Sequence, residues 1–314
     1  ATLSDIGDGI LNLEFHTKMN VIGSEILEAM HKSIDIAEKN YRGLVIGNDA
    51  ANFSAGANIA MMLMLAIEQE YDELDMAIRY FQNTIMRVRY SGIPVAVAPH
   101  GLTLGGGCEM TMHSDVAVAA AETYIGLVEV GAGLIPAGGG TKELALRASD
   151  KYFKGDIEIP TLQEMSLNIA MAKVATSARE AFDLGILRKG IDIEVMNSNR
   201  VIAEAKNAVL ELANNGYTPP QQRSDIKVLG RSALGSFYTG IASMRMGNYI
   251  SAHDEMIAKK VCYVICGGDL SAPTEVNEQY LLDLEREAFL SLLGEKKTLE
   301  RMQFILKTGK PLRN

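Results

Sequence analysis

The chain has 314 residues, 47% hydrophobic and 22% charged, which suits one large globular domain or two ordinary ones. Its net charge of −9 argues against nucleic acid as the main partner, because neutralising phosphates requires a clustered basic surface. No apolar run reaches the roughly 20 residues that span a bilayer, so we expect no membrane span. We find no signal peptide and expect a cytoplasmic protein.

The first elements alternate between strand and helix. Apolar residues at positions 11, 13 and 15 predict a strand with one wet face. A helix is predicted over residues 24–39, with Ser24 as its cap, and a short buried strand over residues 44–46. This strand–helix–strand order indicates α/β layering.

The remaining pattern becomes increasingly helical. We predict a helix over residues 59–90 and strands over residues 93–98 and 115–119. From about residue 161 to the end, helical patterns dominate. They cover residues 180–184, 199–213, 250–266, 275–293 and 297–307. The best linker is Thr218–Gln222, so the expected division is a core over residues 1–217 and a helical C-terminal subdomain over residues 218–314.

The cysteines and histidines give no disulfide or metal pattern. Cys108, Cys262 and Cys266 are too few for a disulfide framework, which suggests a reducing compartment. We expect Cys262 and Cys266 to pack in a core as small apolar side chains. The five histidines form no ligand motif, so we predict no metal site and interpret them as structural or surface residues.

Two turns of small residues offer backbone donors. A strand runs into Gly105-Gly106-Gly107, and a helical run follows from Cys108, which places N–H groups at a helix N-terminus that favours anions. A plain tight turn is the alternative, and the spacing fits no phosphate-binding fingerprint. The loop Ala55-Gly56-Ala57 would let a carbonyl approach the main chain, so one N–H here and one at Gly106 could hold an enolate oxygen.

Two carboxylates flank these turns. Glu109 and Glu129 lie twenty positions apart, each beside a glycine-rich turn in an apolar stretch. Burying a carboxylate is costly unless it is paired or used, so the two predict acid–base chemistry.

These motifs together resemble the crotonase (enoyl-CoA hydratase/isomerase) family. The matching segments, in order along most of the chain, are Phe53–Asn58, Gly92–Gly101, Leu104–Glu109 and Gly131–Thr141. The resemblance implies an α/β crotonase (ClpP-like) fold, with a core of repeated ββα units and a helical C-terminal region for trimerisation.

The resemblance also implies the site. Ala57 and Gly106 would supply the oxyanion-hole N–H groups. Glu109 would activate a water at the β carbon of a 2-trans-enoyl-CoA, and Glu129 would protonate the α carbon. The further substrate-binding candidates are Ala55, Asn58, Gly105, Gly131 and Gly133.

Retention of both acids favours an enoyl-CoA hydratase of fatty-acid β-oxidation, which needs no cofactor beyond the coenzyme A of its substrate. Two alternatives stay open. One is a 3-enoyl-CoA isomerase, in which one glutamate could move the proton alone. The other is a catalytically silent domain that assembles a multifunctional protein.

Some positions depart from the family pattern. Asn58 stands where the family has an aspartate, and Ala60 where a lysine often contacts the coenzyme's phosphates. Lys18, Lys307 or Lys310 could compensate, although a lysine is more often a solvated surface charge.

Two features have no settled role. The segment over residues 150–172 lacks a counterpart in short members and could shape the acyl site or contact a dehydrogenase portion. Met61, Met62 and Met64 could line an acyl channel or pack in a core.

The tail resembles the C-terminus of bacterial multifunctional β-oxidation proteins, in which a 3-hydroxyacyl-CoA dehydrogenase part precedes a crotonase part. The matching segments are Tyr280–Phe289, Arg301–Gln303 and Leu306–Pro311. A dinucleotide fingerprint is missing, so the resemblance implies the hydratase portion alone, with NAD bound only by the dehydrogenase portion. The start at Ala1 without a methionine agrees with that expectation. We expect a trimer-based homo-oligomer, contact with the dehydrogenase portion, or both.

Overall fold

The computed structural model describes residues 1–314. The chain divides into two compact units that alternate along the sequence. Unit 1 comprises Ala1–Asn58, Tyr80–Gly126 and Val174–Gln221, and unit 2 comprises Ile59–Arg79, Leu127–Lys173 and Gln222–Asn314. The domain division predicted between residues 217 and 218 lies near the last passage from unit 1 to unit 2 and stays a prediction.

The larger sheet of unit 1 has six strands in the order β1-β2-β3-β4-β6-β9. β1 and β2 are antiparallel, and every other pair is parallel. The central strands β3, β4 and β6 are buried throughout, which explains their uniformly apolar sequences. The strands are β1 (Thr2–Asp5), β2 (Ile10–Glu14), β3 (Gly43–Ile46), β4 (Val95–Val97), β6 (Val116–Ala120) and β9 (Ile193–Val195).

A smaller sheet of unit 1 contains β5 (Gly101–Leu104), β7 (Thr123–Gly126) and β8 (Val174–Ala175). Ser54 joins its edge through an isolated bridge to Thr103. Along the chain, each strand of the larger sheet is therefore followed by an extended segment of the smaller sheet. The successive pairs are β3 and Ser54, β4 and β5, and β6 and β7. A helical segment follows each pair, which confirms the predicted ββα spiral.

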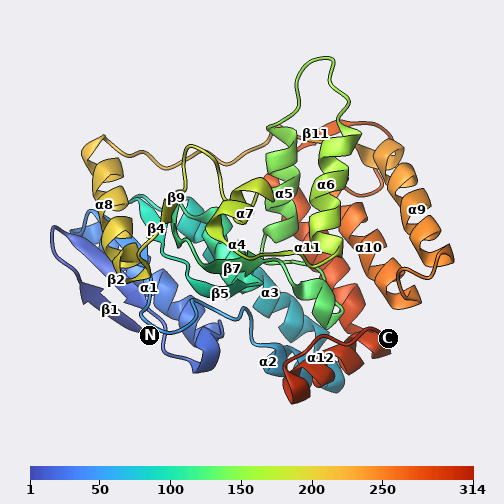
Figure 1. The fold of residues 1–314 in the computed structure, drawn as a ribbon, viewed down its shortest axis with the longest axis horizontal. Coiled ribbons are helices and arrows are strands. Elements are labelled where there is room, and N and C mark those ends of the chain that lie inside the picture. The colour runs from blue at the N-terminus through green and yellow to red at the C-terminus, as the bar shows by residue number, and fades with distance from the viewer. The chain divides into compact units, whose positions relative to one another are not determined.

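Helices cover both faces of the larger sheet. On one face, α1 (Ser24–Asn40), α4 (Gly106–His113) and the unit 1 part of α3 (Tyr71–Arg89) contribute to a core around Phe15 and Phe53. On the other face, α8 (Val201–Asn214) packs Val201 and Val209 against the strands (Figure 1). The short elements of unit 1 are η1 (Lys18–Asn20), α7 (Ala178–Asp183) and η3 (Ser198–Arg200).

Unit 2 is mainly helical, as predicted for the C-terminal part of the chain. α5 packs against α6, α10 and α11, α9 packs on α10, and α2 packs on α12 (Figure 1). Its helices are α2 (Ile59–Glu68), η2 (Glu129–Ala132), α5 (Gly140–Ser149), α6 (Ile159–Ala170), α9 (Gly230–Met246), α10 (Ala252–Ile265), α11 (Glu278–Leu293) and α12 (Lys296–Thr308). Its only strands, β10 (Ile226–Val228) and β11 (Thr274–Val276), form an antiparallel pair.

Some local predictions are wrong. The helix expected over residues 59–90 is two helices, because Gln69 adopts a left-handed conformation with φ +60° between α2 and α3. Ser24 is the first helical residue, and the N-cap is Gly23, without a side-chain cap. The helix expected from Cys108 starts at Gly106.

One further expectation is met. Cys262 and Cys266 are buried free thiols, which confirms that they pack in a core. The longest apolar stretches of the helices are too short or too charged for a membrane crossing. The segment over residues 150–172 contains α6, and nothing in its packing tests its suggested roles.

Candidate active site

The two backbone turns predicted to bind an oxyanion pack against each other in unit 1. Ser54 accepts a hydrogen bond from Leu104 N (2.9 Å), and its own N–H donates to Leu102 O (3.1 Å). This ladder continues β5 into the small-residue loop. A Cβ built at Gly106 would lie 3.5 Å from Ala57 N, so the amides of Ala57 and Gly106 are close neighbours.

Only glycine fits this junction. Gly56 has φ +96°, and a Cβ there would lie 2.9 Å from Leu104 O and 3.4 Å from Gly106 N. Gly105 has φ +52° and forms the N-cap of α4. At Gly106 a Cβ would lie 2.7 Å from the Phe81 ring. The glycines therefore allow two stretches of main chain to approach each other closely.

The N–H groups of Ala57 and Gly106 are not used by the hydrogen bonds of the neighbouring main chain. Gly106 lies in the first turn of α4, where N–H groups have no partner within the helix. Ala57 bridges to Ile22, but the hydrogen bonds of that bridge use Gly56 O and Asn58 N. A pair of amides at a helix N-terminus can stabilise negative charge on a carbonyl oxygen.

Glu109 lies in the same first turn, 3% exposed, and its N–H donates to Gly105 O (2.9 Å). One turn later, the His113 Nδ1 atom lies 2.7 Å from Glu109 O. Unit 1 thus brings Ala57, Gly106 and Glu109 onto one loop-and-helix junction.

Glu129 begins the four-residue turn η2 in unit 2 and is half-buried. Leu134 N donates to Glu129 O (3.0 Å), and Gly133 ends the turn in the left-handed region with φ +86°. Gly131 lies close to Pro311, since a Cβ there would be 3.4 Å from the Pro311 Cβ atom. Glu109 and Glu129 belong to different units, and their pairing remains a prediction.

The other predicted binding residues have plain structural surroundings. Ala55 N donates to Met19 O (3.0 Å), and Asn58 N donates to Ile22 O (3.2 Å), so both stretches are anchored to the segment after β2. Lys18, Lys307 and Lys310 are exposed, and their contact with coenzyme phosphates stays a prediction. Met64 is exposed, whereas Met61 and Met62 are half-buried.

Sequence reasoning missed two side chains on α12. Thr298 hydrogen-bonds to Gly133 O and Arg301 to Val130 O, across 165 and 171 residues of chain. No spacing in the sequence links such distant positions, and the sequence includes Arg301 only in the tail motif Arg301–Gln303.

Comparisons with known proteins place the chain near enoyl-CoA hydratases and fatty acid oxidation proteins. Residues 5–154 match the family model for enoyl-CoA hydratase/isomerase. The chain is 46% identical over 314 residues to a Bacillus subtilis protein named "Probable 3-hydroxyacyl-CoA dehydrogenase", covering 100% of this chain and 39% of that protein. It is 27% identical over 312 residues to a Rickettsia felis protein named "Putative fatty acid oxidation complex trifunctional enzyme", covering 93% of this chain and 37% of that protein.

Solved structures show the same fold. An enoyl-CoA hydratase from Bacillus halodurans superposes with a TM-score of 0.65 at 14% identity, over 96% of this chain and 99% of that one. The chain therefore has the fold of this enoyl-CoA hydratase, and its match to the enoyl-CoA hydratase/isomerase family model covers residues 5–154. It spans about two fifths of the length of the curated relatives that it matches.

Proposed function

We propose that the chain is an enoyl-CoA hydratase that adds water to 2-trans-enoyl-CoA thioesters. The observation that carries this proposal is the junction of two glycine-dependent turns, at which the Ala57 and Gly106 amides lie beside the buried Glu109. Hydration needs hydrogen-bond donors for the thioester oxygen. It also needs carboxyl groups that accept a proton from the attacking water and give a proton to the α carbon. The sequence supplies both acids.

The proposed steps follow from charge development. The Ala57 and Gly106 amides polarise the thioester carbonyl and stabilise the enolate that forms when oxygen adds to the β carbon. Glu109 accepts a proton from the attacking water, whose oxygen bonds to the β carbon. Glu129 gives a proton to the α carbon, and the product is a 3-hydroxyacyl-CoA. No cofactor other than the substrate's coenzyme A takes part.

The wider context is also a proposal. The names of the relatives support the proposal that this chain is one portion of a multifunctional β-oxidation protein. In such a protein, NAD would be bound by a separate 3-hydroxyacyl-CoA dehydrogenase portion. A trimer-based assembly and a cytoplasmic location remain predictions, for which light scattering and cell fractionation are direct tests.

Substitution of the acids tests the activity. Positioned general acids and bases contribute about 10²–10⁴-fold, so Glu109→Gln and Glu129→Gln should each lower crotonyl-CoA turnover by that order. Wild-type turnover in both variants would refute the hydratase assignment. The same variants assayed with a 3-enoyl-CoA identify the isomerase alternative, which predicts that one substitution alone is tolerated.

A further inference from the structure

The turn that carries Glu129 is held from outside by α12. The Thr298 Oγ1 atom donates to Gly133 O (2.9 Å), and the Arg301 Nη1 atom donates to Val130 O (3.2 Å). Both side chains are fully buried. These contacts hold the carbonyl of Val130, within the turn, and the carbonyl of Gly133, directly after it.

Gly133 makes the contact unusually close. A Cβ there would lie 2.8 Å from the Thr298 Cα atom and 2.9 Å from its hydroxyl oxygen. Helix α12 therefore abuts the main chain of the turn directly, and the turn cannot shift without displacing the helix. A single 3₁₀ turn of four residues has poor internal hydrogen-bond geometry and needs such external support.

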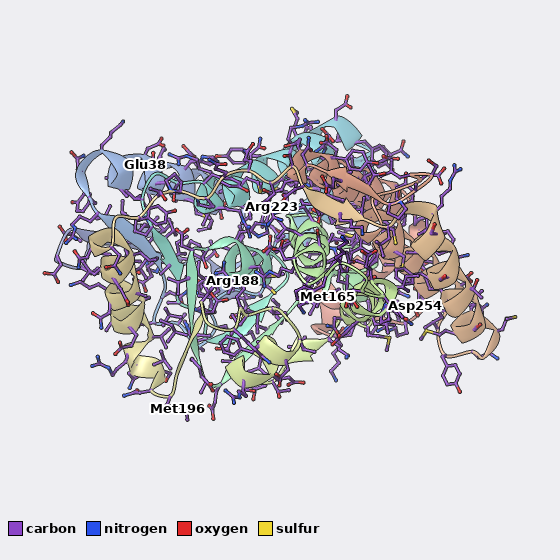
Figure 2. The ribbon with its side chains drawn as sticks, turned by 90° about the horizontal axis from the view of Figure 1, so that it is seen from above. Glu38, Met165, Arg188, Met196, Arg223 and Asp254 are labelled. Carbon is purple, nitrogen blue, oxygen red and sulfur yellow. The ribbon has the colours of Figure 1, made fainter.

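Two residues of α10 hold these contacts in place. The His253 Nε2 atom lies 3.0 Å from the Thr298 Oγ1 atom. Because the single hydroxyl proton goes to Gly133 O, we assign the shared hydrogen bond to an Nε2–H donor. Asp254, labelled in Figure 2, pairs with Arg301 at 2.8 Å and with Arg313 at 2.9 Å.

A purely stabilising role explains this arrangement poorly. Burying Arg301 and Asp254 together gains little stability over apolar packing, because both charges lose their hydration. The geometry instead directs donors at two carbonyls within four residues of Glu129. Such supporting contacts are how a site holds a reacting side chain within a fraction of an ångström.

We propose that Thr298 and Arg301 are positioning residues for Glu129, and that His253 and Asp254 orient them. The inference rests on the proposed role of Glu129 in hydration. It assigns part of the activity to α10 and α12, helices more than 100 residues from Glu129 in the sequence.

The first test is a matched pair of variants. Thr298→Val keeps the shape but removes the donor to Gly133 O, and Thr298→Ser keeps the hydroxyl. Misplacement of a reacting group by about 1 Å lowers rates about 10²-fold, so Thr298→Val should lower kcat for crotonyl-CoA by about 10- to 100-fold with little change in KM. Thr298→Ser should restore most of the activity.

The matched control is Thr239→Val on α9. Thr239 is exposed, and its hydroxyl also donates to a backbone carbonyl, that of Gly235 (2.9 Å). This variant should keep wild-type kcat. Arg301→Lys is a second probe, since it keeps the charge beside Asp254 but shortens the reach to Val130 O, and it should also lower kcat more than it changes KM.

A double-mutant cycle separates positioning from general damage. If Thr298 acts through Glu129, adding Thr298→Val to Glu129→Gln should lower kcat by no more than about twofold. An equal fold loss in both backgrounds, or wild-type kcat in folded Thr298→Val and Arg301→Lys, would overturn the inference. Failure of the hydratase proposal itself shows separately, as wild-type turnover of both Glu109→Gln and Glu129→Gln.

Discussion

At the scale of single residues, the site depends on where side chains are missing. Ala57 and Gly106 were predicted from their motif, and the structure places their amides side by side. The reason is steric, because Gly56 and Gly106 each occupy a position that a Cβ would close. Gly56 is the more restrictive of the two, since its φ of +96° also strains any other residue.

Gly56→Ala should therefore damage catalysis more than stability. The methyl group would press on Leu104 O and separate the loop from Gly106, and losing one oxyanion donor lowers kcat by about 10²–10³-fold. Turnover of crotonyl-CoA by the folded variant is the measurement.

Gly190→Ala is its control, because Gly190 has φ +81° with nothing within 4 Å of an added Cβ. It imposes the same backbone strain, about 1–3 kcal/mol, without a clash near the site. Equal kcat losses in both variants would contradict the steric explanation.

At the scale of elements, buried ionic and polar contacts tie helices to turns. The N-terminus of α5 is capped from α11, where Glu285 accepts hydrogen bonds from Gly139 N (3.0 Å) and from Lys142 N. The buried Lys142 ammonium in turn pairs with Glu278 at 2.8 Å. The contact between α10 and α12 through His253 follows the same principle and is sensitive to pH.

Burial, followed by the nearby Arg301 and Lys297, lowers the pKa of His253 from its ordinary 6.5 to about 4. Asp254 and Glu300 oppose this effect only in part. The folded state thus keeps the imidazole neutral. The contribution of His253 to the free energy of unfolding is therefore complete above pH 6.5 and is lost as the pH falls through 4. The depressed pKa corresponds to about 3 kcal/mol of stability at most.

His253→Gln isolates this contribution, because the glutamine amide can still donate to Thr298 and does not titrate. We expect the free energy of unfolding of the wild type to fall more steeply than that of the variant between pH 6.5 and 4, measured by urea denaturation at each pH. Parallel curves for the two proteins would show that His253 is already charged or solvated in the folded state.

At the scale of the whole molecule, local patterns predicted the fold class, and the division between residues 217 and 218 stays a prediction. Alternating and apolar runs located β2, β3, β4 and β6, because buried strands have short, distinctive patterns. α9 was missed, since its glycines and serines weaken a helical pattern. Gln69 broke a predicted helix because a left-handed residue other than glycine gives no sequence signal.

Only part of the candidate site follows from local sequence patterns. Glu109 and the amide donors lie within motifs of neighbouring residues, so they could be chosen as candidates from the sequence and its family resemblance. The support of Glu129 by Thr298 and Arg301 arises from tertiary packing across the chain, which one sequence does not encode in any local pattern. The alternation of units 1 and 2 along the chain has the same origin.

The central claim is that the chain adds water to an activated double bond. Its most direct measurement is mass spectrometry of the product formed from crotonyl-CoA in water enriched in ¹⁸O. The account predicts a 3-hydroxyacyl-CoA that carries one ¹⁸O atom on the β carbon. An unlabelled product with a shifted double bond, or recovery of unchanged crotonyl-CoA, would contradict it.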